Sequence, residues 1–139
     1  MPHLLTNFEY TRMIYTYAYD SSFTPSMPVV AIKIGRSLTM PALSLNALID
    51  SGADCVIIPV LYLRQVRARK ERTVWMRTVT GTRSIVDLYS VSLQFGPFEF
   101  RNRLVAGGLE PNEIIIGRDI LNQFVVTLNG LASTVEISE

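Results

Sequence analysis

The stretch ALIDSGADCVIIP, residues 47–59, is the most informative segment of this sequence. Two apolar runs flank a short polar loop that begins at Asp50 and ends at Asp54. Apolar, β-branched runs of this length are typical of buried strands. A carboxylate between two buried strands is costly unless it is paired or used in chemistry. The loop therefore marks Asp50 as a candidate catalytic residue.

A second informative stretch, IIIGRD, covers residues 114–119. It reads as a buried strand that ends at Gly117 and is followed by two charged residues. Between the two stretches, strand-like runs over residues 73–79 and 84–95 flank a Thr-Gly-Thr triplet centred on Gly81. This arrangement predicts a hairpin with a glycine at its tip.

The rest of the chain is also dominated by strand-forming residues. Short helices are expected over 60–69 and over 119–124, where Asp119 can cap the first turn. The segment 106–113, with Gly107, Gly108 and Pro111, is expected to be a loop. Many short strands with one or two short helices predict an all-β barrel or sandwich. The remaining predicted strands cover 13–19, 28–34, 43–49, 55–58, 98–105, 125–128 and 133–137.

Composition excludes several other classes of protein. The net charge is +1, which gives no support to nucleic-acid binding. The segment RQVRARKER, residues 64–72, is basic, and we interpret it as a solvated face, with a nucleic-acid contact as the weaker alternative. Cys55 is the only cysteine, so no intrachain disulfide and no cysteine-based zinc site is expected. No apolar run approaches the roughly 20 residues that span a bilayer, and no secretion signal is evident, so a cytoplasmic location is expected.

The order of these motifs resembles that of the retropepsin-like (retroviral-type) aspartic peptidases, over about residues 28–137. The catalytic loop of that family, Asp-Thr/Ser-Gly-Ala, corresponds here to residues 50–53, and its second signature, apolar residues followed by Gly-Arg-Asn/Asp, corresponds to residues 114–119. The hairpin around Gly81 lies where the family has its flap. The resemblance implies a closed β-barrel of short strands with a flap hairpin and one short C-terminal helix, assembled as a homodimer.

The same resemblance implies a peptidase domain over residues 28–139, preceded by an N-terminal extension over residues 1–27. This extension is longer than in the compact viral enzymes. It can add a strand, act as a removable pro-piece, or change the dimer contact, and the sequence leaves these alternatives open.

The activity that the resemblance implies is that of an aspartic endopeptidase acting on peptide or protein substrates, with no metal or cofactor. Each of two chains supplies one Asp50, and two carboxylates held side by side cannot both ionise cheaply. The ionised carboxylate acts as general base on a water held between the pair, while the protonated one polarises the peptide carbonyl.

The remaining site residues are also assigned by resemblance. The loop residues Ser51 and Gly52 complete the catalytic set. Ser51 is expected to hydrogen-bond across to the partner's loop, although an ordinary turn serine is the alternative. Asp54 and Arg118 are expected to form an ion pair, with two unrelated surface charges as the alternative. Substrate-binding roles fall to Ala53, Asp54, Val79, Thr80, Gly81 and Thr82, and structural support of the site to Ile116, Gly117 and Arg118.

Two other functions are compatible with parts of the same sequence. Ser51 is not expected to be a hydrolase nucleophile, because no Gly-x-Ser-x-Gly elbow surrounds it and the only histidine, His3, lies near the N-terminus. The main alternative is a catalytically silent dimerisation or peptide-binding module of the same fold. The unbroken Asp-Ser-Gly-Ala loop favours the enzyme, because a site that has lost its activity has no reason to keep a costly carboxylate.

Overall fold

The computed structural model describes residues 13–37, 39, 42–77 and 80–139. The described part of the chain is mostly strand, with two short helices, α1 (Val60–Gln65) and α2 (Arg118–Leu121). Neither of these helices is long and apolar enough to cross a membrane. The strands are β1 (Tyr15–Ala18), β2 (Val29–Gly35), β3 (Leu43–Ile49), β4 (Ile57–Pro59), β5 (Arg69–Arg77), β6 (Arg83–Phe95), β7 (Phe98–Gly108), β8 (Ile115–Ile116), β9 (Val125–Asn129) and β10 (Thr134–Ser138).

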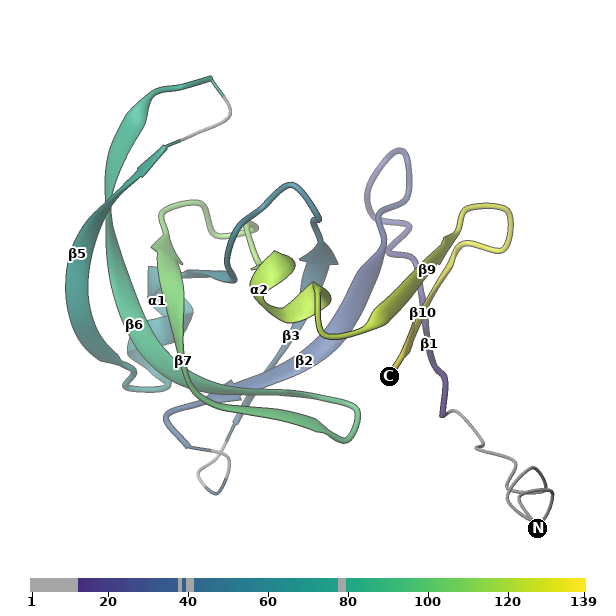
Figure 1. Ribbon diagram of the computed structural model, residues 1–139, viewed down its shortest axis with the longest axis horizontal. Helices are drawn as coiled ribbons and strands as arrows, with labels where there is room; N and C mark the ends of the chain where they lie inside the picture. Colours follow the sequence, from purple (N-terminus) through teal and green to yellow (C-terminus); the bar gives the residue numbers. More distant parts are fainter. Residues whose placement is uncertain (1–12, 38, 40–41, 78–79) are drawn as a thin grey trace, which may run out of the picture.

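A closed β-barrel forms the body of the molecule (Figure 1). Within the described residues, its strands follow the order β2-β3-β8-β4-β7-β6, and a further pairing of β2 with β6 closes the ring. β8 pairs with β3 in parallel, so that Ile49 lies beside Ile116. This pairing brings the end of the 47–59 stretch next to the 114–119 stretch, and it is the step that assembles the site.

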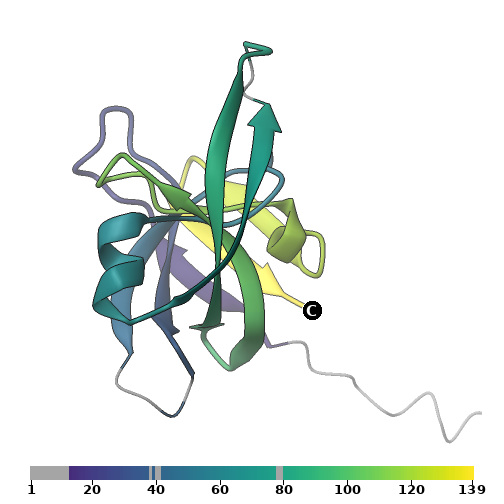
Figure 2. The ribbon, with the colours of Figure 1, turned by 90° about the vertical axis from the view of Figure 1, so that its left-hand side faces the viewer.

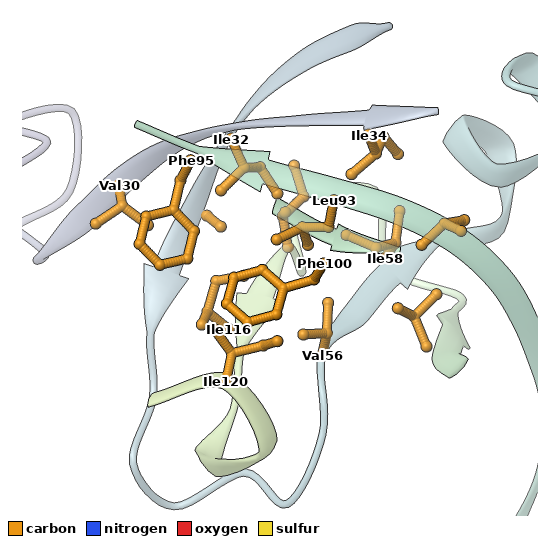
Figure 3. Close-up of a cluster of buried hydrophobic side chains, with 14 of the residues drawn as sticks. Val30, Ile32, Ile34, Val56, Ile58, Leu93, Phe95, Phe100, Ile116 and Ile120 are labelled. Atoms are coloured by element: carbon orange, nitrogen blue, oxygen red, sulfur yellow. The ribbon is translucent and has the colours of Figure 1, made fainter. Parts of the chain in front are cut away.

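Strand alternation explains the core of the barrel. In β2 the side chains of Val30, Ile32 and Ile34 are buried, whereas Ala31 and Lys33 between them are exposed. An alternating strand buries one face in this way, because successive side chains point to opposite sides. Figure 3 shows these side chains meeting Val56, Ile58, Leu93, Phe95, Phe100, Ile116 and Ile120 in the centre of the barrel.

A smaller sheet, with the order β1-β10-β9, packs against the barrel through aromatic rings. Tyr15 of β1 meets Phe98 edge to face at 5.4 Å between ring centroids, and Phe98 meets Phe124 at 4.7 Å. Residues 15–18 of the N-terminal stretch therefore form a strand that pairs with β10. Residues 1–12 lie outside the described part, and the domain boundary at residue 28 stays a prediction.

The barrel, the hairpin and the short C-terminal helix confirm the predicted fold class. The prediction was wrong for residues 106–108, which form the end of β7 and not a loop. A Cβ on Gly107 would lie 2.9 Å from a ring carbon of Tyr89 and 3.0 Å from Val60. The glycines here allow close packing of the strand and do not mark a turn.

The predicted helix over residues 119–124 begins one residue earlier, at Arg118, and has Gly117 at its N-cap position. No side chain caps it, so the predicted capping role of Asp119 is wrong. The Asp119 carboxylate accepts the N–H of its own neighbour Ile120 at 2.9 Å and that of Val56 at 3.4 Å. Asp119 therefore connects α2 to the start of the strand that follows the polar loop.

Candidate active site

Asp50 is the first residue after β3, and backbone contacts hold it on both sides. Its N–H donates to the carbonyl of Ile116 at 3.1 Å, which continues the β3–β8 pairing by one step. Its carbonyl accepts the N–H of Ala53 at 3.2 Å, and this contact closes a tight turn. The Asp50 side chain is half-buried, and its Oδ1 accepts the N–H of Gly52 at 2.9 Å. The carboxylate therefore has a fixed direction even in a single chain.

Gly117 lets the second motif pass directly beneath this loop. A Cβ at this position would lie 2.6 Å from the carbonyl oxygen of Cys55 and 2.8 Å from that of Ala53. Both are backbone atoms, so neither can rotate away. The absence of a side chain allows the N–H of the next residue, Arg118, to donate to the Ala53 carbonyl at 2.9 Å.

Arg118 connects helix α2 to the polar loop by two contacts. One guanidinium nitrogen, Nη1, donates to the carbonyl of Ser51 at 2.7 Å, and Nη2 forms an ion pair with Asp54. The predicted Asp54–Arg118 ion pair is therefore present. A forked guanidinium suits such a double contact, since its donors are held in one plane.

Two ionisable groups beside the loop are affected by burial. Desolvation raises the pKa of the Asp119 carboxyl, and the hydrogen bonds from Val56 and Ile120 offset only part of that effect. Burial also raises the pKa of the Cys55 thiol, and the nearby charges of Asp119 and Asp54 raise it further. Cys55 is half-buried and its thiol stays neutral at ordinary pH, as expected for a packed residue and not a reactive one.

A cleft of about 650 Å³ opens over the Asp50 carboxylate. The loop contributes one side of it, and the other sides come from the ends of β5, β6 and β7, from β4, α1 and β8, and from the segment around Glu113. Its lining is mostly apolar, with acidic groups between the apolar ones. The lining residues are Asp50, Gly52, Ala53, Asp54, Cys55, Ile57, Val60, Met76, Arg77, Ser84, Ile85, Val86, Asp87, Ala106, Gly107, Gly108, Leu109, Glu110, Glu113 and Ile115.

The β5–β6 hairpin projects well beyond the barrel, as Figures 1 and 2 show. Its strands pair in register up to Arg77 and Arg83, and Gly81 adopts a φ of 83°, a left-handed conformation that favours glycine. Trp75 and Ile85 face each other across the hairpin, each 61% exposed. The described part of the hairpin thus has the shape expected of a flap.

The structure brings most of the predicted site residues together. Asp50, Gly52, Ala53 and Asp54 line the cleft, and Ser51 lies on the exposed side of the same loop. Ile116, Gly117 and Arg118 lie directly beneath the loop. Thr80, Gly81 and Thr82 lie at the hairpin tip and are not among the residues that line the cleft. Val79, also predicted to bind substrate, lies outside the described residues.

Sequence reasoning did not identify the other cleft residues. Met76 and residues 84–87 line the cleft from the arms of the hairpin, and Glu110 and Glu113 line it from the segment before β8. Strand alternation would not have indicated the hairpin residues, because it selects every second residue, whereas the consecutive residues 84–87 all line the cleft. The two glutamates gave no signal, because a turn-rich segment has no periodicity that shows which side chains face a site.

Comparison with known proteins agrees with the family that the sequence motifs resemble. Residues 24–129 match the family model described as retroviral aspartyl protease. The match covers both motifs, the hairpin and the whole barrel. No curated protein sequence matches this chain.

Two solved structures share the fold. One is a retropepsin-like aspartic protease from Rickettsia conorii, with a TM-score of 0.60 and 10% identity, covering 94% of this chain and 96% of that one. The other is the EIAV protease in complex with an inhibitor, with a TM-score of 0.53 and 24% identity, covering 70% of this chain and 86% of that one. At these identities the likeness concerns the fold.

Proposed function

This chain belongs to the retroviral aspartyl protease family, and on that premise we propose that it is an aspartic endopeptidase that works as a homodimer. The observation that carries this proposal concerns the charged neighbours of Asp50. Of the aspartates in the cleft, Asp54 pairs with Arg118 and Asp87 pairs with Lys70. Among the described residues, no cation lies within ion-pair distance of Asp50. A half-buried carboxylate in that state suits chemistry better than support of the fold.

The proposed reaction needs a second carboxylate, and a second copy of the chain supplies it. Two Asp50 side chains that face each other share one proton, because two adjacent negative charges repel strongly. The ionised carboxylate takes a proton from a bound water, which attacks the peptide carbonyl. The protonated partner donates to the carbonyl oxygen and, in the next step, a proton reaches the leaving nitrogen. Neither Asp50 has a permanent role, since the pair titrates as a unit.

The surrounding residues are proposed to position this pair. The Gly52 N–H fixes one carboxylate oxygen, and Arg118 fixes the loop from below. The hairpin arms close over the bound peptide and exclude water, which strengthens electrostatic interactions in the cleft. Ser51, exposed on the loop, is proposed to hydrogen-bond to the loop of the second copy.

The test is the conservative variant Asp50→Asn, which keeps the shape of the side chain and removes its ability to ionise. We expect it to lower kcat/KM on a peptide library at mildly acid pH by at least about 10²-fold, because a proton-transfer group contributes roughly 10²–10⁴-fold. The matched control is Asp20→Asn, outside the cleft, which should retain the parent rate. Equal cleavage by Asp50→Asn and the parent would refute the role of Asp50. Peptide binding without turnover by the parent would favour the silent binding module.

A further inference from the structure

One wall of the cleft carries an acidic pair that the proposed reaction does not use. Glu110 and Glu113 line the cleft beside Leu109 and Ile115. The residues between them, Pro111 and Asn112, together with Ile114, line a separate hollow of about 370 Å³. The segment 110–114 therefore separates two hollows, and its two glutamates line the hollow that contains Asp50.

These glutamates have no cation of their own in the described part of the chain. The other acidic groups of the cleft, apart from Asp50, are neutralised: Asp54 by Arg118 and Asp87 by Lys70 at 3.4 Å. Neither Glu110 nor Glu113 takes part in an ion pair among the described residues. Among the described residues, Arg77 is the one basic residue of the cleft lining, and it belongs to the hairpin arm and not to this wall. The wall therefore presents uncompensated negative charge to whatever occupies the cleft.

Apolar side chains line the same cleft as this charge. Ile57, Val60, Val86 and Ile115 line the same cleft. Lysine and arginine side chains have an apolar stem and a cationic head, and such side chains lay the stem along apolar surface while the head reaches a polar partner. An apolar lining with a carboxylate beside it fits this shape better than it fits a purely apolar or an acidic side chain.

The position of Glu113 places it close to the bond that would be cut. The Leu48 N–H donates to the Ile114 carbonyl at 2.8 Å, and the Asp50 N–H donates to the Ile116 carbonyl at 3.1 Å. Glu113 directly precedes Ile114 and lies three residues before Ile116, the residue that anchors Asp50, just outside the start of β8. Glu113 and Asp50 line the same cleft of about 650 Å³. A peptide whose scissile bond meets Asp50 therefore has a neighbouring side chain in the part of the cleft that Glu113 lines.

We propose that this wall makes the enzyme select peptides with lysine or arginine near the scissile bond, with Glu113 as the main specificity-determining residue and Glu110 as the second. This inference rests on the proposed function of the cleft. Glu113 is half-buried, whereas Glu110 is exposed, so solvent and salt screen the charge of Glu113 less. A charge-assisted hydrogen bond from a substrate ammonium or guanidinium to Glu113 is the recognising contact.

The experiment compares matched peptides that differ at one position near the cleavage site and carry lysine, glutamine or glutamate there. For the parent enzyme near neutral pH, we expect kcat/KM to be at least about tenfold higher for the lysine peptide than for the glutamine peptide. In Glu113→Gln this preference should fall to within about threefold, and Glu110→Gln should lower it by less. The control Glu99→Gln, on the exposed β6–β7 hairpin, should keep the parent preference.

Recognition is also measured without turnover, so that this inference and the proposed function fail separately. The same peptides are titrated against Asp50→Asn, and against Asp50→Asn combined with Glu113→Gln, by fluorescence anisotropy. Tighter binding of the lysine peptide that is lost in the double variant supports the inference even if no cleavage is found. Cleavage or binding that does not distinguish lysine from glutamine would overturn it and leave the proposed endopeptidase intact.

Discussion

At the scale of single residues, the site depends on glycines, which have no side chain, as much as on its charged residues. Gly117 lies so close to the Ala53 and Cys55 carbonyls that any Cβ would overlap them. The Asp50 carboxylate receives its one described hydrogen bond from a backbone N–H, that of Gly52. The bare backbone of Gly117 beneath the loop and the Gly52 N–H within it together set the direction of the Asp50 carboxylate, the proposed catalytic group.

Gly117→Ala should therefore destabilise the fold strongly. The new methyl group must displace backbone atoms, and overpacking of this kind costs typically about 1–3 kcal/mol, occasionally more. Urea unfolding measures the loss of free energy. Gly130→Ala is the matched control, because a Cβ there meets nothing within 4 Å. If both variants unfold at the same urea concentration, the close approach under the loop does not constrain the chain.

At the scale of secondary-structure elements, helix α2 acts as a clamp on the loop. Its first residue, Arg118, holds Ser51 and Asp54, and its second, Asp119, accepts the N–H of Val56. A helix of only four residues has little stability of its own, so these tertiary contacts hold it in place. The helix and the loop should therefore respond together to substitution.

Arg118→Lys tests the clamp while keeping the charge. The ammonium group of lysine lacks the planar fork with which the guanidinium contacts both the Ser51 carbonyl and the Asp54 carboxylate. We expect the free energy of unfolding to fall by about 1 kcal/mol or less, since the ion pair is partly exposed. We also expect kcat to fall, and this loss, converted to a free energy, should exceed the loss in the free energy of unfolding. The reason is that the loop that orients Asp50 becomes less rigid. Steady-state kinetics beside urea unfolding separates the two effects. Unchanged kcat would show that the clamp does not position the carboxylate.

Asp119 gives α2 a defined pH response. Burial raises the pKa of its carboxyl in the folded chain above the unfolded value, so the folded chain binds the proton more tightly. Its contribution to stability is thus complete below the unfolded pKa and is lost as the pH rises through the folded pKa. Asp119→Asn removes this titration. The stability of the variant relative to the parent should rise as the pH increases from below the ordinary aspartate pKa of about 3.9 to above the raised folded value, measured by urea unfolding at each pH. A constant difference across that range would contradict this account.

Element by element, the sequence predicted most strands to within a residue or two, because apolar alternation is a local signal. The limits of β3, Leu43–Ile49, were predicted in full. The end of β7 was missed, since Gly107 and Gly108 look like a turn until Tyr89 and Ile57 are seen packed against them.

The Asp54–Arg118 pair was expected only from the resemblance, because the two residues are far apart in the sequence. The glutamates of the cleft wall were missed, as their direction depends on which side of a loop faces Asp50.

At the scale of the whole molecule, one chain provides half of the proposed site. The cleft contains a single unpaired aspartate among the described residues, and the proposed chemistry needs two carboxylates. Closure of the barrel by β2 and β6 could not be predicted from local sequence, because it joins strands about 60 residues apart through long-range pairing. The terminal sheet exposes Leu128 and Val125, and Met13 and Ile14 lie exposed just before its first strand. These apolar residues suit contact with a second copy.

If two copies share one site, specific activity should fall on dilution. Below the dissociation constant of the dimer, the rate per chain becomes proportional to chain concentration, because the active species is a pair. Adding an excess of the Asp50→Asn chain should also inhibit the parent, as mixed pairs carry only one ionisable Asp50. Sedimentation at the same concentrations reports the dimer directly. Activity per chain that stays constant while the protein is monomeric would exclude the shared site.

One distance in a crystal structure of the assembled protein decides whether two copies share a site. We expect the Asp50 carboxylates of two copies to lie in one cleft, with their nearest oxygens at hydrogen-bond distance, about 2.5–3.0 Å. Carboxylates that are far apart, or a dimer whose contact leaves each Asp50 alone in its own cleft, would contradict the account.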